Sequence, residues 1–286
     1  MIKFAERNLK IFLRDRAAVF FSLLAVLIVL GLYLLFLGEQ LVNSVSELID
    51  GADFLMNSWI FAGVLAVTPV TSTLGSFGVM INDKGKKIYK DLICTPIKPW
   101  KLAGGYILSS FCIGMIMSII IFILSEVFIV LNGGELLPLS LAAEVLGTIV
   151  IAVLASSAMM YFIVSFFNSQ GAFTAASTVI GTLIGFIMGI YLPIGELSEG
   201  LQYVIELFPI SHAASLFRKF FMEVPLDRSF SGIPDEFATQ FKIQMGIEYQ
   251  IGDFTFSSLD SLIYLIVTAL VFYILGILVT ARKRTA

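Results

Sequence analysis

Six long apolar stretches alternate with shorter polar segments along the chain. They cover residues 17–37, 57–80, 103–131, 141–166, 171–192 and 259–281, and each is free of charged residues near its middle. A hydrocarbon core about 30 Å thick needs roughly 20 apolar residues in an α-helix, so each stretch is long enough to cross it. The pattern predicts an all-α polytopic membrane protein with six transmembrane helices in a single transmembrane domain over residues 1–286.

Composition supports this fold class. Hydrophobic residues make up 58% of the 286 residues and charged residues 14%, against roughly 45–50% and about 25% in soluble domains. A soluble or disordered chain is therefore excluded. The net charge of −3 also argues against a nucleic-acid partner, which would require a concentrated basic surface.

Lysine and arginine are confined to particular polar segments. Of the 18, 14 lie in the N-terminal arm, in the loop after the second stretch and in the tail. The segment 38–56 has neither residue but carries Glu39, Glu47, Asp50 and Asp53, and the segment 132–140 carries only Glu135. Because short basic loops stay in the cytoplasm, both termini are predicted to be cytoplasmic, and alternation places the uncharged loop 167–170 on the same side.

The first apolar stretch is predicted to be a retained span and not a cleaved signal peptide. It exceeds the 7–15 residues of a signal-peptide core, and no small-x-small cleavage site follows it. The two cysteines, Cys94 and Cys112, cannot form a disulfide framework, and this topology places neither on an oxidising face.

Residues 1–14 have the periodicity of an amphipathic helix. Apolar positions from Ile2 to Leu13 fall on one arc, whereas Lys3, Arg7, Lys10 and Arg14 fall on the opposite one. We expect an interfacial helix along the inner leaflet, with its basic face toward anionic head groups and water. It serves either as a topology anchor or as a lever moved by a cytoplasmic partner.

A lysine-rich segment follows the second span. Residues 82–96 are too polar for lipid, yet Ile88, Leu92 and Ile93 recur at helical spacing, and Pro96 and Pro99 end the pattern. A short cytoplasmic helix with an apolar edge suits a groove on another protein. The alternative is that the lysines serve only as the topology signal.

The longest polar segment covers residues 193–258. Two short amphipathic helices, near 195–208 and 212–222, are separated by Pro209, with Ser211 able to cap the second. Neither is long enough to span, so both are predicted to be re-entrant or interfacial at the outer leaflet. After Pro225 we expect an extracellular cap, with a helix from Pro234 to Met245 closed by Gly246 and an extended stretch from Tyr249 to Phe256.

Enzymatic motifs are missing from the chain. No lysine is followed by Ser or Thr, which excludes a Walker A loop, and one histidine with two separated cysteines cannot build a zinc site. His212 adjoins a helix start, and the chain lacks the Gly-x-Ser-x-Gly motif of serine hydrolases. We therefore expect neither a catalytic site nor a bound cofactor or metal.

Three acidic residues lie toward the outer ends of spans. Glu126, Glu144 and Asp260 either reach interfacial water or form a cluster that handles protons or cations, which would require a buried carboxyl group.

Two spans contain further candidate residues. Pro69 lies among hydroxyl residues of the second span that could satisfy freed carbonyls, in a kink that either faces a cavity or is buried structure. Gly181, Gly185 and Gly189 form a small-xxx-small pattern in the fifth span, suited to packing within the chain or between subunits.

These features together resemble an ABC-2-type permease, the membrane subunit of a bacterial ABC exporter. The resemblance rests on the basic amphipathic start running into Arg14–Phe21, the six spans, the lysine-rich segment ending in Thr95-Pro96, and the paired short helices before the last span. It implies that residues 1–14 form a connecting helix, that about 82–95 form a coupling helix docked on a separate ATPase subunit, and that the second and fifth spans line the path. ATP and Mg would then be used by the ATPase, and two permease copies or sister permeases would assemble.

The resemblance assigns roles to individual residues. The expected coupling residues are Asp83, Lys84, Lys87, Ile88, Asp91 and Leu92. The expected path residues are Thr68, Pro69, Thr71, Ser177, Thr178 and Thr182, with Gly181, Gly185 and Gly189 in helix packing. We expect a multi-pass permease of the bacterial cell membrane that exports an amphipathic or hydrophobic drug, peptide antibiotic or lipid. The alternative is a membrane sensor or immunity protein whose extracellular cap binds a ligand.

Overall fold

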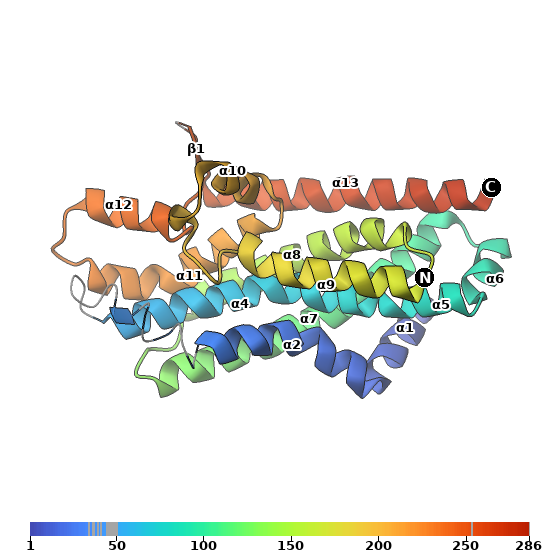
Figure 1. The fold of residues 1–286 in the computed structure, drawn as a ribbon, viewed down its shortest axis with the longest axis horizontal. Helices are drawn as coiled ribbons and strands as arrows, with labels where there is room; N and C mark the ends of the chain where they lie inside the picture. Colours follow the sequence, from blue (N-terminus) through green and yellow to red (C-terminus); the bar gives the residue numbers. More distant parts are fainter. Residues whose placement is uncertain are drawn as a thin grey trace.

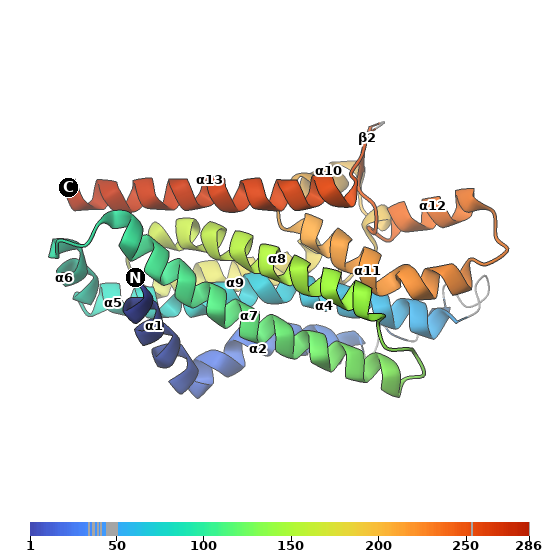
Figure 2. The same cartoon turned by 180° about the vertical axis from the view of Figure 1, so that it is seen from behind.

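A computed structural model describes residues 1–33, 35, 38, 40, 42–43, 51–252 and 254–285, with the backbone alone for Ala25, Ile93, Lys283, Arg284 and Thr285. The chain forms an elongated bundle of helices (Figure 1). Both termini and α6 lie at one end of the bundle, here called the terminal end. The helices α10 and α12 and the β1–β2 hairpin lie at or toward the other, the cap end (Figures 1 and 2).

The described elements follow one another with short connections. They are α1 (Ile2–Arg14), α2 (Arg16–Leu32), α4 (Ala52–Ser76), α5 (Gly78–Gly85), α6 (Ile88–Cys94), α7 (Pro99–Leu131), α8 (Leu139–Ser165), α9 (Gln170–Ile187), η2 (Ile194–Glu196), α10 (Glu199–Leu207), α11 (Ser211–Ser229), α12 (Asp235–Gln244), β1 (Gln250–Ile251), β2 (Phe254–Thr255) and α13 (Ser258–Thr285).

Five of the six predicted apolar stretches form helices long and apolar enough to cross a membrane. Among the described residues these helices are Ala52–Gly85, Pro99–Leu131, Leu139–Ser165, Gln170–Ile187 and Ser258–Arg282. The first predicted span begins as α2, which has 17 described residues. Residues 34, 36 and 37 of that span, and Glu39, Glu47 and Asp50 of the following loop, lie outside the described residues. The first span, at residues 17–37, therefore remains a prediction.

The helix α4 forms the centre of the bundle. Nearly every side chain from Leu55 to Leu74 is buried, against α2, α7, α8 and α11. In contrast, α9 and α13 lie at the periphery, and α13 presents apolar side chains such as Ile263, Leu270 and Ile274 to the outside. An apolar surface of this extent is typical of a face that meets lipid.

The lysine-rich segment differs from the single helix that the periodicity predicts. The helix α5 continues α4 and ends at Gly85, and α6 begins after Lys87, whose φ of +64° is left-handed. A left-handed lysine costs on the order of 1 kcal/mol, so the turn has to be held by contacts on both sides. It separates α5, which faces the bundle, from α6 at its end (Figure 1).

The segment before the last span also departs in part from prediction. The helix α11 continues through Pro225 to Ser229 instead of ending near Met222. Buried packing along α11 against α4 and α8 outweighs the one hydrogen bond that a proline removes. Ser211 does not cap α11, because its hydroxyl donates to the carbonyls of Ile205 and Phe208 in and after α10. The predicted cap helix is present as α12, and Gln250 pairs with Thr255 in the hairpin beyond it.

His212 fastens α11 to α10 and α13. It is fully buried among the rings of Tyr249, Phe256 and Tyr264. Its Nε2 lies 2.9 Å from the carbonyl of Glu206, which makes Nε2 the protonated nitrogen, and its Nδ1 lies 3.2 Å from the hydroxyl of Ser261. Burial lowers the pKa of His212 to about 4, so the imidazole is neutral at physiological pH.

The lowered pKa predicts a loss of stability in acid. As pH falls from the ordinary histidine pKa of 6.5 toward about 4, His212 becomes protonated in the unfolded chain and stays neutral in the folded protein. The free energy of unfolding should therefore fall by roughly 3 kcal/mol over that interval. Thermal unfolding of the purified protein in detergent between pH 7 and pH 4.5 measures this. A His212→Gln variant should lose less stability over the same interval, and an equal loss in both proteins would contradict the assignment.

Candidate translocation groove and coupling end

A groove with a volume of about 1040 Å³ lies between α2 and α9, with α4 and α5 as its floor. Figure 1 shows α2 and α9 on either side of α4. Each helix lines the groove with one helical stripe of positions three or four apart. The floor stripe is Thr71, Leu74, Gly75 and Gly78. Gly75 permits close approach, since a Cβ there would lie 3.1 Å from the Cβ of Ser22 in α2.

The two walls of the groove differ in chemistry. The α2 wall is mainly apolar, with Phe21, Leu24 and Ile28 beside Ser22. The α9 wall begins with Gln170 and Phe173 and continues as a row of hydroxyl and small residues, Thr174, Ser177, Thr178, Gly181 and Thr182. Among the described lining residues Asp15 alone is charged, and its carboxylate accepts a hydrogen bond from the amide of Ala18 at the start of α2. The groove therefore suits a ligand that is mostly apolar and has few polar groups.

The structure brings together four of the six predicted path residues. Thr71, Ser177, Thr178 and Thr182 all line the groove. The hydroxyls of Thr178 and Thr182 donate to carbonyls one turn back in α9, and that of Ser177 has no partner among the described residues. The Ser177 oxygen is buried, so the accessible hydroxyls of this wall are those of the threonines.

Thr68 and Pro69 do not reach the groove. Both are buried inside the bundle, and the Thr68 hydroxyl donates to the carbonyl of Val64. The hydroxyls of Ser72 and Thr73, one turn later in α4, donate to the backbone carbonyls of Thr68 and Pro69. Pro69 has no N–H for the carbonyl of Leu65, and none of these hydroxyl bonds goes to that carbonyl. At these two positions the kink is buried structure.

The three glycines predicted to pack as one ridge have separate surroundings. Gly181 lines the groove, and a Cβ there would meet open space. Gly185 lies against the ring of Tyr191. The helix α9 ends at Ile187, so Gly189 lies beyond it with a φ of +61°, which favours glycine. The continuous ridge inferred from the spacing is therefore wrong, because it required a helix extending to residue 192.

Arg218 of α11 closes the end of α9. Its side chain is fully buried, and its Nη2 donates to the carbonyls of Met188 and Gly189 at 2.6 and 2.7 Å. The guanidinium lies over the ring of Trp59, 4.9 Å from its centroid. Burial lowers the pKa of Arg218 to about 10, which still leaves it charged. A cation at a helix C-terminus satisfies carbonyls that lack partners in the helix.

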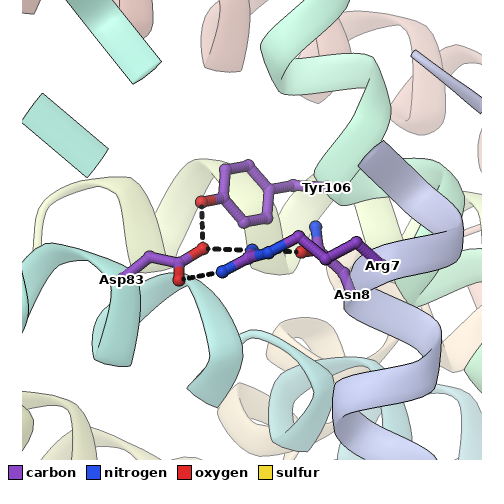
Figure 3. Close-up of polar contacts among 4 residues, drawn as sticks. All are labelled: Arg7, Asn8, Asp83 and Tyr106. Atoms are coloured by element: carbon purple, nitrogen blue, oxygen red, sulfur yellow. Dashed lines mark hydrogen bonds and ion pairs between the residues drawn. The ribbon is translucent and has the colours of Figure 1, made fainter. Parts of the chain in front are cut away.

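At the terminal end, α1 is tied to α5 and α7 by a buried carboxylate (Figure 3). Arg7 donates from Nη1 and Nη2 to the two oxygens of Asp83, both at 2.8 Å, and Tyr106 donates to the same carboxylate at 2.9 Å. Asp83 is 4% exposed. It raises the pKa of the Arg7 guanidinium above its ordinary value. The helical wheel that placed Arg7 on the water-facing arc of α1 is therefore wrong at this position.

The rest of α1 agrees with its amphipathic pattern in part. Ala5 and Phe12 face the bundle, and Phe12 packs against Ile113 and Met117 of α7. Ile2 and Leu13, which the pattern assigned to the apolar arc, are exposed.

The six predicted coupling residues divide into an inner and an outer group. Asp83 is buried, and the ammonium of Lys84 donates to the carbonyls of Val164, Ser165 and Phe167 at the end of α8. Asp83 is therefore not on an accessible docking surface, and the ammonium of half-buried Lys84 is bonded to the bundle. Lys87 and Asp91 are exposed, whereas Ile88 and Leu92 are half-buried, and Leu92 packs against the core. The Ile93 side chain lies outside the described residues, and among the described side chains of α6 the exposed charged residues are Lys90 and Asp91.

The three acidic candidates do not form a cluster. Glu126 accepts from the amide of Leu137 at 2.9 Å, Asp260 caps α13 together with Ser257, and Glu144 is exposed on α8. Among the described residues no group of three or more His, Cys, Asp or Glu side chains could hold a metal ion.

Comparison with known families assigns the chain. A family model described as an ABC-2 family transporter protein matches residues 49–278. The chain belongs to this family. No curated protein and no solved structure matches it. Membership makes the chain the membrane component of an ABC transporter and a multi-pass membrane protein. The family match includes the floor and the α9 wall of the groove and leaves out α1 and α2.

The inner ion pair predicts an asymmetric effect of mutation on this permease. In Arg7→Met the Asp83 carboxylate stays buried with Tyr106 as its remaining partner, whereas in Asp83→Asn the Arg7 side chain, 36% exposed, can turn to water. A buried group left unsatisfied costs roughly 1–3 kcal/mol. Arg7→Met should therefore lower the unfolding temperature more than Asp83→Asn, measured by thermal unfolding in detergent. Combining both substitutions should recover part of the loss.

A matched control uses the exposed pair on the same helix. Lys10 contacts Glu6 at 2.6 Å with both side chains in solvent, so Lys10→Met should leave the unfolding temperature unchanged. Equal losses in Arg7→Met and Lys10→Met would show that burial of Asp83 is not the cause.

Proposed function

We propose that this chain is the permease subunit of an ATP-driven exporter and that the groove between α2 and α9 is its translocation path. The observation that carries the proposal is the coincidence of the groove with four of the path residues predicted from the sequence, Thr71, Ser177, Thr178 and Thr182. One apolar wall and one wall of hydroxyls favour an amphipathic or hydrophobic cargo such as a drug, a peptide antibiotic or a lipid.

The docking surface for the ATPase subunit is the exposed part of α6 and its flanking turns. Lys86, Lys87, Lys90 and Lys98 are exposed there, at the end of the bundle that holds both termini. Four lysines with one nearby exposed acid, Asp91, favour an acidic groove on the partner. ATP and Mg would be bound by that partner. This requires the terminal end to face the cytoplasm of a bacterial cell, as the distribution of lysine and arginine predicts.

The assembly needs a second permease, either another copy or a sister chain. The helix α9 is the most exposed of the five long apolar helices, and Val179, Leu183 and Phe186 form an apolar outer face. A second permease placed against this face would separate these apolar side chains from lipid.

The docking surface is tested by charge reversal. Lys87→Glu with Lys90→Glu should abolish co-purification of the ATPase with the tagged permease from its native membrane, because both exposed cations become anions. The measurement is vanadate-sensitive ATP hydrolysis in the purified material. Lys242→Glu on α12, at the cap end, is the control and should retain that activity. Retention by the double variant would refute the docking assignment.

The groove is tested by filling it. Thr178→Trp should remove the stimulation of ATP hydrolysis by a panel of amphipathic antibiotics while leaving basal hydrolysis intact, because the indole occupies the path. Leu270 of α13 is 58% exposed and lies neither in the groove nor on the outer face of α9, so Leu270→Trp is the control and should keep the stimulation. Equal responses of the two variants would show that the cargo does not enter this groove.

A further inference from the structure

Asp83 and Lys84 are adjacent in α5, and each is bonded to a different side of the bundle. The bonds of Asp83 go to Arg7 in α1 and Tyr106 in α7, and those of Lys84 go to the end of α8. If the proposed function holds, these bonds bear on the width of the groove, since α1 leads into the α2 wall and the end of α8 leads into the α9 wall.

The Asp83 bonds reach the α2 wall through α1. Asp15 is the single residue between α1 and α2, and it connects them closely. Its amide donates to the carbonyls of Ile11 and Phe12 at the end of α1, while its carboxylate accepts from the amide of Ala18 in α2. A displacement of α1 is therefore passed directly to α2. The bidentate contact of Arg7 with Asp83 fixes orientation as well as distance.

The Lys84 bonds reach the α9 wall through the turn after α8. The ammonium lies 2.6 Å from the carbonyl of Phe167 and 3.2 Å from those of Val164 and Ser165. The helix α9 begins at Gln170, and Ser169 caps it by accepting from the amide of Ala172. Two residues therefore separate the anchored carbonyl of Phe167 from the first turn of the wall.

The docking helix α6 is fixed to the same place. Tyr89 of α6 is buried, with its ring centroid 6.3 Å from that of Tyr106. The ammonium of Lys84 lies 5.5 Å from the centre of the Tyr89 ring, within the range of a cation–π contact. A displacement of α6 thus acts on both Asp83 and Lys84.

We propose that Asp83 and Lys84 are positioning residues that transmit movement of α6 to the two walls of the groove. Asp83 acts through Arg7 on α1 and α2, and Lys84 acts through the α8–α9 turn on α9. One event at the docking surface then changes the separation of the walls, because the two bonded routes leave one short helix in different directions. The charge of each side chain matches its bonding partner, since the Asp83 carboxylate accepts from a guanidinium and the Lys84 ammonium donates to helix-end carbonyls.

The two routes can be separated in the permease alone, in lipid nanodiscs, by amide hydrogen exchange. Asp83→Asn should speed exchange in α1 and the first turns of α2 and leave the start of α9 unchanged. Lys84→Met should speed exchange at the start of α9 and leave α1 unchanged. Tyr106→Phe keeps the Arg7 pair and serves as the control within the cluster. Exchange that rises in both regions in either variant, or in neither, would overturn the two routes whether or not the chain is a transporter.

Transmission is tested in the complex with the ATPase that co-purifies with the tagged permease. Spin labels at Leu27→Cys in α2 and Gly171→Cys at the start of α9, where a side chain would meet open space, report the separation of the walls. The background carries Cys94→Ser and Cys112→Ser, and the complexes contain one labelled copy. Trapping with ATP and vanadate should change that distance in the otherwise unmodified protein. Asp83→Asn and Lys84→Met should each lose most of the change while ATP hydrolysis continues, and Lys10→Met should retain it.

The outcomes distinguish the two proposals. A full distance change in Asp83→Asn or Lys84→Met would overturn transmission by that residue, whereas continued hydrolysis without the change supports it and a purely structural role does not predict it. Lack of ATP hydrolysis or of a distance change in the unmodified complex would count against the proposed function instead. In that case the exchange measurements still decide whether Asp83 and Lys84 anchor the two walls separately.

Discussion

The satisfaction of helix-end carbonyls in a largely apolar bundle is the constraint on which this structure depends. The last four carbonyls of a helix lack partners within it, and lipid supplies none. Here cations from other helices close two such ends: Lys84 of α5 binds the end of α8, and Arg218 of α11 binds the end of α9. The helix α9 makes little buried contact along its length, so bonds near its start and at its end determine its position beside the groove.

Hydropathy and spacing predicted the parts of the fold that depend on local sequence. Five long helices, the cap helix α12 and the extended stretch around Gln250 follow from apolar length, proline and glycine. The continuation of α11 through Pro225 could not be predicted, because its stability comes from burial against α4 and α8 rather than from local preference. The same holds for the end of α9 at Ile187, since an arginine 31 residues later binds the carbonyls that follow it.

The candidate site shows the same division between local and distant information. Thr178 and Thr182 share a helical stripe, and the stripe lies on the groove as its period predicts. The prediction that Thr68 and Pro69 line the path is wrong, because other helices surround α4 and only one narrow stripe of α4 reaches the groove. Arg7 belongs to the polar arc predicted for α1, but its partner Asp83 is 76 positions away. The periodicity of one helix cannot predict a contact with a residue so distant in the sequence. A lone acid after an apolar span, next to a lysine, is the signal that could have suggested it.

The two arginines that hold the walls differ in how easily their contacts can open. Arg218 is fully buried, stacked on Trp59 and bonded to carbonyls, so any movement would leave a desolvated cation without acceptors. Arg7 is 36% exposed, and water can replace part of its contact with Asp83. Breaking the first contact is therefore much more costly than adjusting the second. The groove is consequently fixed at the end where α11 meets α9 and adjustable at the end where α6 lies, which is the end that a docked ATPase would move.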